Sequence, residues 1–105
     1  MEDLFVRASE QPWEQVSGGP QGMQRKVLRK AADGTPKVAL LKLEPGFEMD
    51  AHSHSHAENH YVLEGMYETE GTECPTGSYR MVPKHNEHGP FRSRTGALLL
   101  IVWED

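Results

Sequence analysis

Short apolar runs separated by turn residues recur along this chain of 105 residues, and none of them has helical periodicity. The residues from Met23 to Lys30 alternate between apolar and polar, and the run from Val38 to Leu43 is strongly apolar. Asp33-Gly34 and Pro36 lie between the two runs and are typical of a turn. This stretch is therefore expected to form a β-hairpin.

The rest of the chain repeats this plan of short runs and turns. Turn residues at Glu44-Pro45-Gly46, Glu70-Gly71 and Arg94-Thr95-Gly96 divide it into further strands. Beyond residues 46–65, we expect a strand at Met66 to Thr69 that returns antiparallel, and then strands at Tyr79 to Val82, His88 to Ser93 and Ala97 to Trp103. About eight to ten short strands without helices predict an all-β antiparallel sandwich or barrel.

The last of these strands, with the sequence ALLLIVW, is apolar on both faces. A strand with one solvated face alternates between apolar and polar residues, so this strand must be covered on both sides. It is therefore either central between two layers or an edge covered by a second subunit, because an exposed apolar edge invites aggregation.

Composition and charge narrow the class of protein. The length fits one domain, with an arm and loop over residues 1–22 and a barrel over residues 23–105. The net charge of −5 argues against nucleic acid or an anionic membrane as the main partner, because both attract a basic face. Four basic residues of the first hairpin strand are assigned to a solvated edge strand: Arg25, Lys26, Arg29 and Lys30.

Membrane spans and disulfides are not expected. No apolar run approaches the roughly 20 residues of a membrane span, and the start Met1-Glu2-Asp3 lacks the plan of a signal peptide. The single cysteine, Cys74, cannot form an intramolecular disulfide and is expected to be a small core filler. A cytoplasmic location is the expectation.

All six histidines fall between His52 and His88. His52, His54 and Glu58 have the spacing H-x-H-x3-E. In an extended strand the two histidines point the same way, and a short turn lets Glu58 begin the next strand facing the same interior. His88 is the natural fourth ligand, from a distant strand. Such a set suits one divalent ion of Mn, Fe, Ni, Cu or Zn, with open positions for water or substrate.

The histidine run has two other interpretations. His54, His56 and His60 also read H-x-H-x3-H, which together with His88 would make an all-histidine site. Alternatively, the run is a solvated loop or a purification tag without a site. Tags are terminal, however, whereas this run is internal and precedes the strand-like sequence YVL.

The spacing of these residues resembles the two motifs of the cupins. The first motif, G-x5-H-x-H-x3-4-E-x6-G, is filled over residues 46–65 by Gly46, His52, His54, Glu58 and Gly65. The second, G-x5-P-x-G-x2-H-x3-N, is matched over residues 77–92 by Gly77, Pro83 and His88. The resemblance implies a cupin jelly roll, also called a double-stranded β-helix barrel. It favours the ligand set with Glu58, because the all-histidine register displaces both glycines of the first motif.

The second motif departs from the cupin pattern at two positions. His85 stands where the motif has glycine, so it must tolerate a positive φ or sit in a differently shaped turn. Arg92 stands where the motif has asparagine, and a guanidinium near a metal pocket would bind a carboxylate or enolate. Its other interpretation is a surface charge beside Arg94. Phe91 and Met81 could line the pocket mouth or belong to the core.

Alternation along the strand after Glu58 places His60 on the same interior face. With a reference pKa of about 6.5, His60 is a candidate acid or base, together with Glu58. The other interpretation is a buried imidazole that orients Glu58 or a water. Tyr61 and Leu63 have the opposite parity and should pack into the other layer.

The resemblance implies a small metal-dependent enzyme, leaving open whether this chain is one. Its substrate would be a small molecule with adjacent oxygens that chelate the metal, such as an enol, diketone, hydroxy-ketone or keto acid. Cupin dioxygenases imply cleavage with O2, whereas Mn or Zn alone would favour isomerisation or decarboxylation. Because many cupins dimerise through their sheets, a homodimer is expected.

The second hypothesis is a metal-binding or small-ligand-binding sensor module. The segment GSYRMVPKHNEHGPF, followed by GALLLIVW, looks like the cupin-like domains attached to zinc anti-sigma factors and also like small diketone-cleaving dioxygenases. No helical region precedes the motifs in this sequence, which favours the enzyme over the sensor.

Overall fold

The structure, a computed structural model, describes residues 2–16, 18–87 and 89–104. Within these residues it has nine β-strands and one short 3-10 helix, Ala8–Glu10. The strands are β1 (Glu14–Gln15), β2 (Met23–Lys30), β3 (Pro36–Leu43), β4 (Phe47–Met49), β5 (Ala57–Thr69), β6 (Thr72–Pro75), β7 (Tyr79–Val82), β8 (Phe91–Ser93) and β9 (Ala97–Glu104). No helix long and apolar enough to cross a membrane occurs in the described residues.

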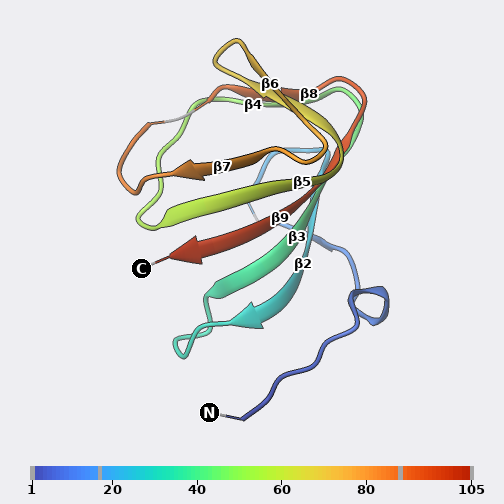
Figure 1. The fold of residues 1–105 in the computed structure, drawn as a ribbon, viewed down its shortest axis with the longest axis vertical. Coiled ribbons are helices and arrows are strands. Elements are labelled where there is room, and N and C mark those ends of the chain that lie inside the picture. The colour runs from blue at the N-terminus through green and yellow to red at the C-terminus, as the bar shows by residue number, and fades with distance from the viewer. Residues whose placement is uncertain (1, 17, 88, 105) are drawn as a thin grey trace.

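The strands form two antiparallel sheets that share β5 (Figure 1). The first sheet has the order β1-β2-β3-β9-β5-β7 and the second has the order β4-β8-β5-β6. Figure 1 shows them curling around a common interior, which is the plan of a jelly roll. The prediction of an all-β jelly roll is confirmed.

The predicted hairpin is β2 and β3, which pair antiparallel. Its turn is held by Asp33, whose Oδ1 accepts the backbone N–H of Thr35 at 3.0 Å. This local hydrogen bond is the reason that aspartate is favoured in such turns. The strand predicted at Tyr79–Val82 is also present, as β7.

The prediction that Met66 to Thr69 returns as a separate strand is wrong, because β5 continues through Gly65 to Thr69. Gly65 has a φ of 73°, and the register with β9 shifts between Val62 and Glu64. A Cβ at Gly65 would lie 2.1 Å from the carbonyl oxygen of Gly96, so only glycine fits here. This irregularity lets one strand leave the first sheet and enter the second.

β9 lies between β3 and β5, so the apolar last strand is not an edge, although in the described residues no second sheet covers its outer side as the prediction of two layers required. It is central rather than an edge. Its inner side chains are buried, including Leu99 and Ile101, and its outer ones, including Leu98 and Leu100, are half-buried.

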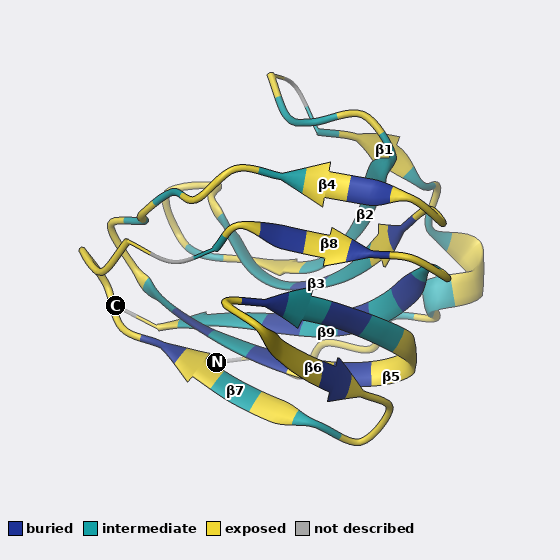
Figure 2. Cartoon of the chain, turned by 90° about the horizontal axis from the view of Figure 1, so that it is seen from above, coloured by how far each residue is buried: buried dark blue, intermediate teal, exposed yellow. Residues whose placement is uncertain are grey.

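Tyr61 and Leu63 do not pack into the other layer as predicted, because in the described residues no layer covers β5 and β7 on that side of the first sheet (Figure 2). Both are exposed, as are Tyr79 and Met81 on the neighbouring β7. Tyr61 pairs with Tyr79, and Asn59 pairs with Met81, so these side chains all lie on the same side of the sheet. We call Tyr61, Leu63, Tyr79 and Met81 the outer apolar face.

The hydrophobic core lies between the two sheets. Its buried members come from both of them: Leu43, Phe47, Val62, Tyr67, Cys74, Phe91, Ala97, Leu99 and Ile101. Cys74 is a free, buried thiol in this cluster, which confirms its prediction as a small filler.

Candidate metal centre

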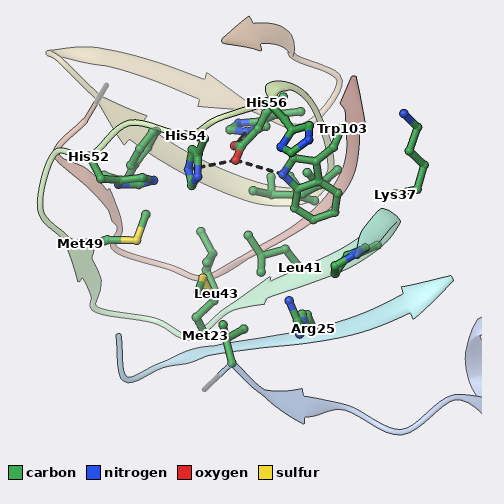
Figure 3. Close-up of a pocket in the computed structure, with 18 of the residues that line it drawn as sticks. Met23, Arg25, Lys37, Leu41, Leu43, Met49, His52, His54, His56 and Trp103 are labelled. Atoms are coloured by element: carbon green, nitrogen blue, oxygen red, sulfur yellow. Dashed lines mark hydrogen bonds and ion pairs between the residues drawn. The ribbon is translucent and has the colours of Figure 1, made fainter. Parts of the chain in front are cut away.

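A cavity of about 460 Å³ opens between the sheets and is lined mainly by apolar side chains (Figure 3). Leu41, Leu43 and Leu99 form part of its walls, while the histidines of the first cupin-like motif gather at one end. A cavity of this size with a few polar groups at one end is typical of small-molecule sites.

Glu58 is the centre of that polar end. It lies near the start of β5 and is only 6% exposed. Its Oε1 lies 2.8 Å from His60 Nε2, and its Oε2 lies 2.9 Å from His54 Nε2. Trp103, on β9, donates its indole N–H to Oε2 at 3.1 Å. A buried carboxylate is stable only with such partners.

The pKa values of Glu58 and His54 are both lowered, for different reasons. Burial alone would raise the pKa of Glu58, but the hydrogen bond from His60, the neighbouring imidazoles and the indole N–H of Trp103 outweigh burial. Burial is the main cause for His54, and the charge of Glu58 opposes it only in part. The pair therefore favours an anionic carboxylate beside a neutral imidazole, the protonation states that a metal requires.

His52 and His54 lie in the loop between β4 and β5, not in a strand, and both line the cavity. Their rings contact each other edge to face, with centroids 4.4 Å apart, and the His52 ring also packs on Phe91 at 5.7 Å. The backbone N–H of His85 donates to the carbonyl oxygen of His54 at 2.8 Å. This bond ties the second motif to the first.

His85 tolerates the left-handed backbone, with a φ of 63°, which is the first of its two predicted alternatives. His88, the predicted fourth ligand, lies outside the described residues. Among the residues that are described, no group of three or more His, Cys, Asp or Glu side chains is arranged to hold a metal ion. The donors at this end, two imidazoles and one carboxylate, are nevertheless of the chemical type that divalent transition metals prefer.

His60 also lines the cavity and lies at the other oxygen of Glu58 from His54. Its ring is buried, with Nε2 on Glu58 and Nδ1 3.2 Å from the hydroxyl of Tyr67. A carboxylate only accepts, so Nε2 donates to Glu58, and Nδ1 is left to pair with the hydroxyl of Tyr67. Burial, followed by the nearby Cys74, raises the pKa of Tyr67, which keeps its hydroxyl protonated and donating. Both ring nitrogens of His60 are thus engaged within the protein.

His56 is exposed, and its Nδ1 lies 3.1 Å from the hydroxyl of Ser55. His56 and His60 both line the cavity, but the ring nitrogens of His60 face Glu58 and Tyr67. The all-histidine register needs His54, His56 and His60 to converge, and this arrangement does not favour it.

Arg92 is not at the cavity. Its Nε donates to Glu68 at 2.9 Å, and Arg94 pairs with the same carboxylate at 3.3 Å, so the interpretation as a surface charge holds. Met81 is 48% exposed on the outer apolar face, whereas Phe91 is buried and lines the cavity.

The arginine that does line the cavity is Arg25. The prediction of a solvated surface charge is wrong for Arg25, which is half-buried. The signal was its parity, because Arg25 alternates in phase with the apolar Met23, which also lines the cavity.

The fold is similar to those of several solved structures. KdgF from Halomonas sp. is 25% identical over 96% of this chain and 93% of its own, with a TM-score of 0.73. An acetylacetone dioxygenase from Acinetobacter johnsonii is 14% identical over 98% of this chain and 74% of its own, with a TM-score of 0.83. A chain in the structure of Rhodobacter sphaeroides SigE in complex with the anti-sigma ChrR is 21% identical over 93% of this chain and 52% of its own, with a TM-score of 0.72.

The comparison with curated proteins gave no match. The sequence model of the ChrR Cupin-like domain family, however, matches residues 1–104, nearly the whole chain. The two motifs, the jelly roll and the histidine-lined cavity agree with that match. This chain therefore belongs to the ChrR cupin-like domain family, within the cupin superfamily.

Proposed function

We propose that this chain is a divalent-metal-dependent cupin that acts on a small oxygen-chelating substrate, such as an enol, diketone, hydroxy-ketone or keto acid. The observation that carries the proposal is the buried Glu58 carboxylate, held by His54, His60 and Trp103 at the end of a 460 Å³ apolar cavity. Anionic and imidazole donors facing such a cavity favour a metal with a small organic ligand over a purely structural site.

His52, His54, Glu58 and His88 are the proposed ligands, and a Mn, Fe, Ni, Cu or Zn ion held there would act as a Lewis acid towards adjacent substrate oxygens. The chain's own residues supply the rest. The leucines of the cavity exclude water from the substrate, and Phe91 fixes the His52 ring.

Glu58 and His60 are the proposed proton-handling pair. Glu58 is either a ligand or, when it is released from the metal, a base that takes a proton from the substrate. His60 orients its carboxylate through Nε2 and can return a proton to it, with Tyr67 on the other nitrogen holding the tautomer. The proposed reaction is dioxygenase-type cleavage, or isomerisation or decarboxylation where the metal is not redox-active. The likeness to an acetylacetone dioxygenase supports this only at the level of the fold.

The test is elemental analysis of protein purified without added metal, followed by O2 uptake with a panel of diketones, hydroxy-ketones and keto acids. We expect a bound divalent metal and uptake that depends on it. A protein that retains no metal, and consumes neither O2 nor any member of the panel after metal is supplied, contradicts the proposal.

The alternative is a non-catalytic sensor module, favoured by the match to the ChrR Cupin-like domain family. The metal distinguishes the two. A redox-active ion with exchangeable water favours the enzyme, whereas tightly held Zn without exchangeable water favours the module.

We also propose that the chain acts in the cytoplasm, without nucleic acid or membrane as its partner. The single, buried, unpaired Cys74 is compatible with a reducing compartment, and the net charge of −5 opposes binding to polyanions.

A homodimer formed through the outer apolar face is part of this proposal. Tyr79 is 63% exposed there and Met81 48%. Contiguous exposed apolar side chains of this kind mark interaction surfaces.

Met81→Lys should convert a dimer into a monomer, because burying an unpaired ammonium in an apolar interface is costly. Light scattering after size-exclusion chromatography measures the molar mass and so distinguishes dimer from monomer.

The matched control is Thr72→Lys, which adds the same charge at an exposed position of β6 in the second sheet. It should leave the dimer intact. A wild-type protein that is monomeric at every concentration removes the dimer from the proposal.

A further inference from the structure

Arg25 is a half-buried cation for which the described residues supply no ion pair. It lies on β2 directly opposite Leu41 of β3, and its side chain lines the cavity beside Met23. Its Nε is buried and makes no hydrogen bond. A guanidinium stays charged at any ordinary pH, so a buried N–H of this group needs an acceptor.

No carboxylate of the described residues forms an ion pair with Arg25. Glu58 is the one carboxylate among those that line the cavity, and both its oxygens are occupied by His54, His60 and Trp103. Glu14 faces Arg25 across the β1–β2 pair but is exposed. Within residues 2–16, 18–87 and 89–104, no ion pair of Arg25 is present.

Arg25 and the metal-binding end face each other across the cavity. Figure 3 shows Arg25 on the wall opposite His54 and Trp103, with Leu41 and Leu43 between them. A ligand that spans the cavity thus meets polar groups at its two ends and apolar side chains along its middle. The end at Arg25 matches a planar anion that accepts from the guanidinium fork.

We propose that Arg25 binds a carboxylate of the substrate, so that the cavity takes a molecule with chelating oxygens at one end, an apolar middle and a carboxylate at the other. This inference rests on the proposed function, since it narrows the substrate class of the same site. It assigns to Arg25 the role that the sequence suggested for Arg92. Neutral diketones of the same length would leave the buried N–H without an acceptor.

Binding to the wild-type protein tests it without any need for turnover. Trp103 lines the cavity, so its fluorescence reports occupancy once Trp13 is replaced by phenylalanine. The probes are succinylacetone, a diketone with a terminal carboxylate; acetylacetone, a diketone without one; and heptanoate, a carboxylate without a diketone. In metal-loaded protein, succinylacetone should bind about 10- to 100-fold more tightly than acetylacetone, the gain expected of one hydrogen-bonded ion pair.

Arg25→Met should abolish that preference, because methionine keeps an unbranched side chain but neither charge nor donors. Arg29→Met is the matched control, since Arg29 lies on the same strand and is exposed. Circular dichroism and thermal unfolding check that both variants fold. Arg25→Lys should retain part of the preference, as a cation without the fork.

The outcomes separate this inference from the proposed function. Equal binding of succinylacetone and acetylacetone to the wild-type protein overturns the carboxylate site but leaves diketone chelation standing, and so does an unchanged preference in Arg25→Met. If neither diketone binds, while heptanoate binds to metal-free protein in an Arg25-dependent way, the carboxylate site stands and the proposed chelation is wrong. If none of the three probes binds, both are overturned.

Discussion

Replacing His54 with alanine is expected to remove most of the divalent metal that we propose this site binds. His54 Nε2 lies 2.9 Å from Glu58 Oε2, so the substitution deletes a nitrogen donor and also a partner of the proposed carboxylate ligand. Loss of an outer partner of a ligand costs about 10- to 100-fold in metal affinity, and loss of a ligand itself should cost at least about 100-fold. Elemental analysis and competition with a chelator measure the change.

His56→Ala is the matched control for this prediction, because His56 is two residues away, exposed, and at the edge of the same cavity. It should retain nearly full occupancy. The opposite result, with metal kept in His52→Ala and lost in both His56→Ala and His60→Ala, would establish the all-histidine register.

Replacing Gly65 with alanine will destabilise the fold more than any single loss of a surface contact. The new Cβ would lie 2.1 Å from the carbonyl oxygen of Gly96, on a backbone with a φ of 73°. The atoms nearest the new Cβ belong to the backbone of Gly96 and Ala97, which cannot rotate away as a side chain could. The backbone must therefore shift where β5 passes from one sheet to the other. We expect a loss of about 3 kcal/mol or more in the free energy of unfolding, measured with urea.

Gly71→Ala separates the two causes. Gly71 has a φ of 78°, close to that of Gly65, but nothing lies within 4 Å of its Cβ position. It should cost only about 1–2 kcal/mol, the strain of the left-handed backbone itself. Equal losses for the two variants would show that the contact with Gly96 does not matter.

Local patterns in the sequence determined most of the fold. The alternation of residues 23–30 and the turn at Asp33 gave the β2–β3 hairpin, because a period of two and an Asx turn are set by neighbouring residues. The spacing of the two motifs gave the family and the jelly roll. It also predicted that His54 and Glu58 face one interior, where they lie 2.9 Å apart, although their role as metal ligands stays a prediction.

The tertiary structure alone decided what depends on distant partners. Alternation divides a strand into two faces but does not say which face meets another layer. For that reason Tyr61 was predicted to pack into a second layer, whereas it is exposed. Gly65 has the signature of a break, yet pairing with β9 on one side and β8 further along keeps β5 continuous.

The two arginines show the same limit at the site. In the sequence, Arg92 lies inside a cupin motif and Arg25 lies in a basic strand. Their charge is the same, so the sequence does not show which of them faces the cavity. Glu68 pairs with Arg92 on the outside, while the curl of the first sheet turns Arg25 inward. The sequence by itself determined the strands, the family and the cluster of candidate ligands; which charge faces the cavity follows from long-range packing, because burial is a property of the assembled sheets.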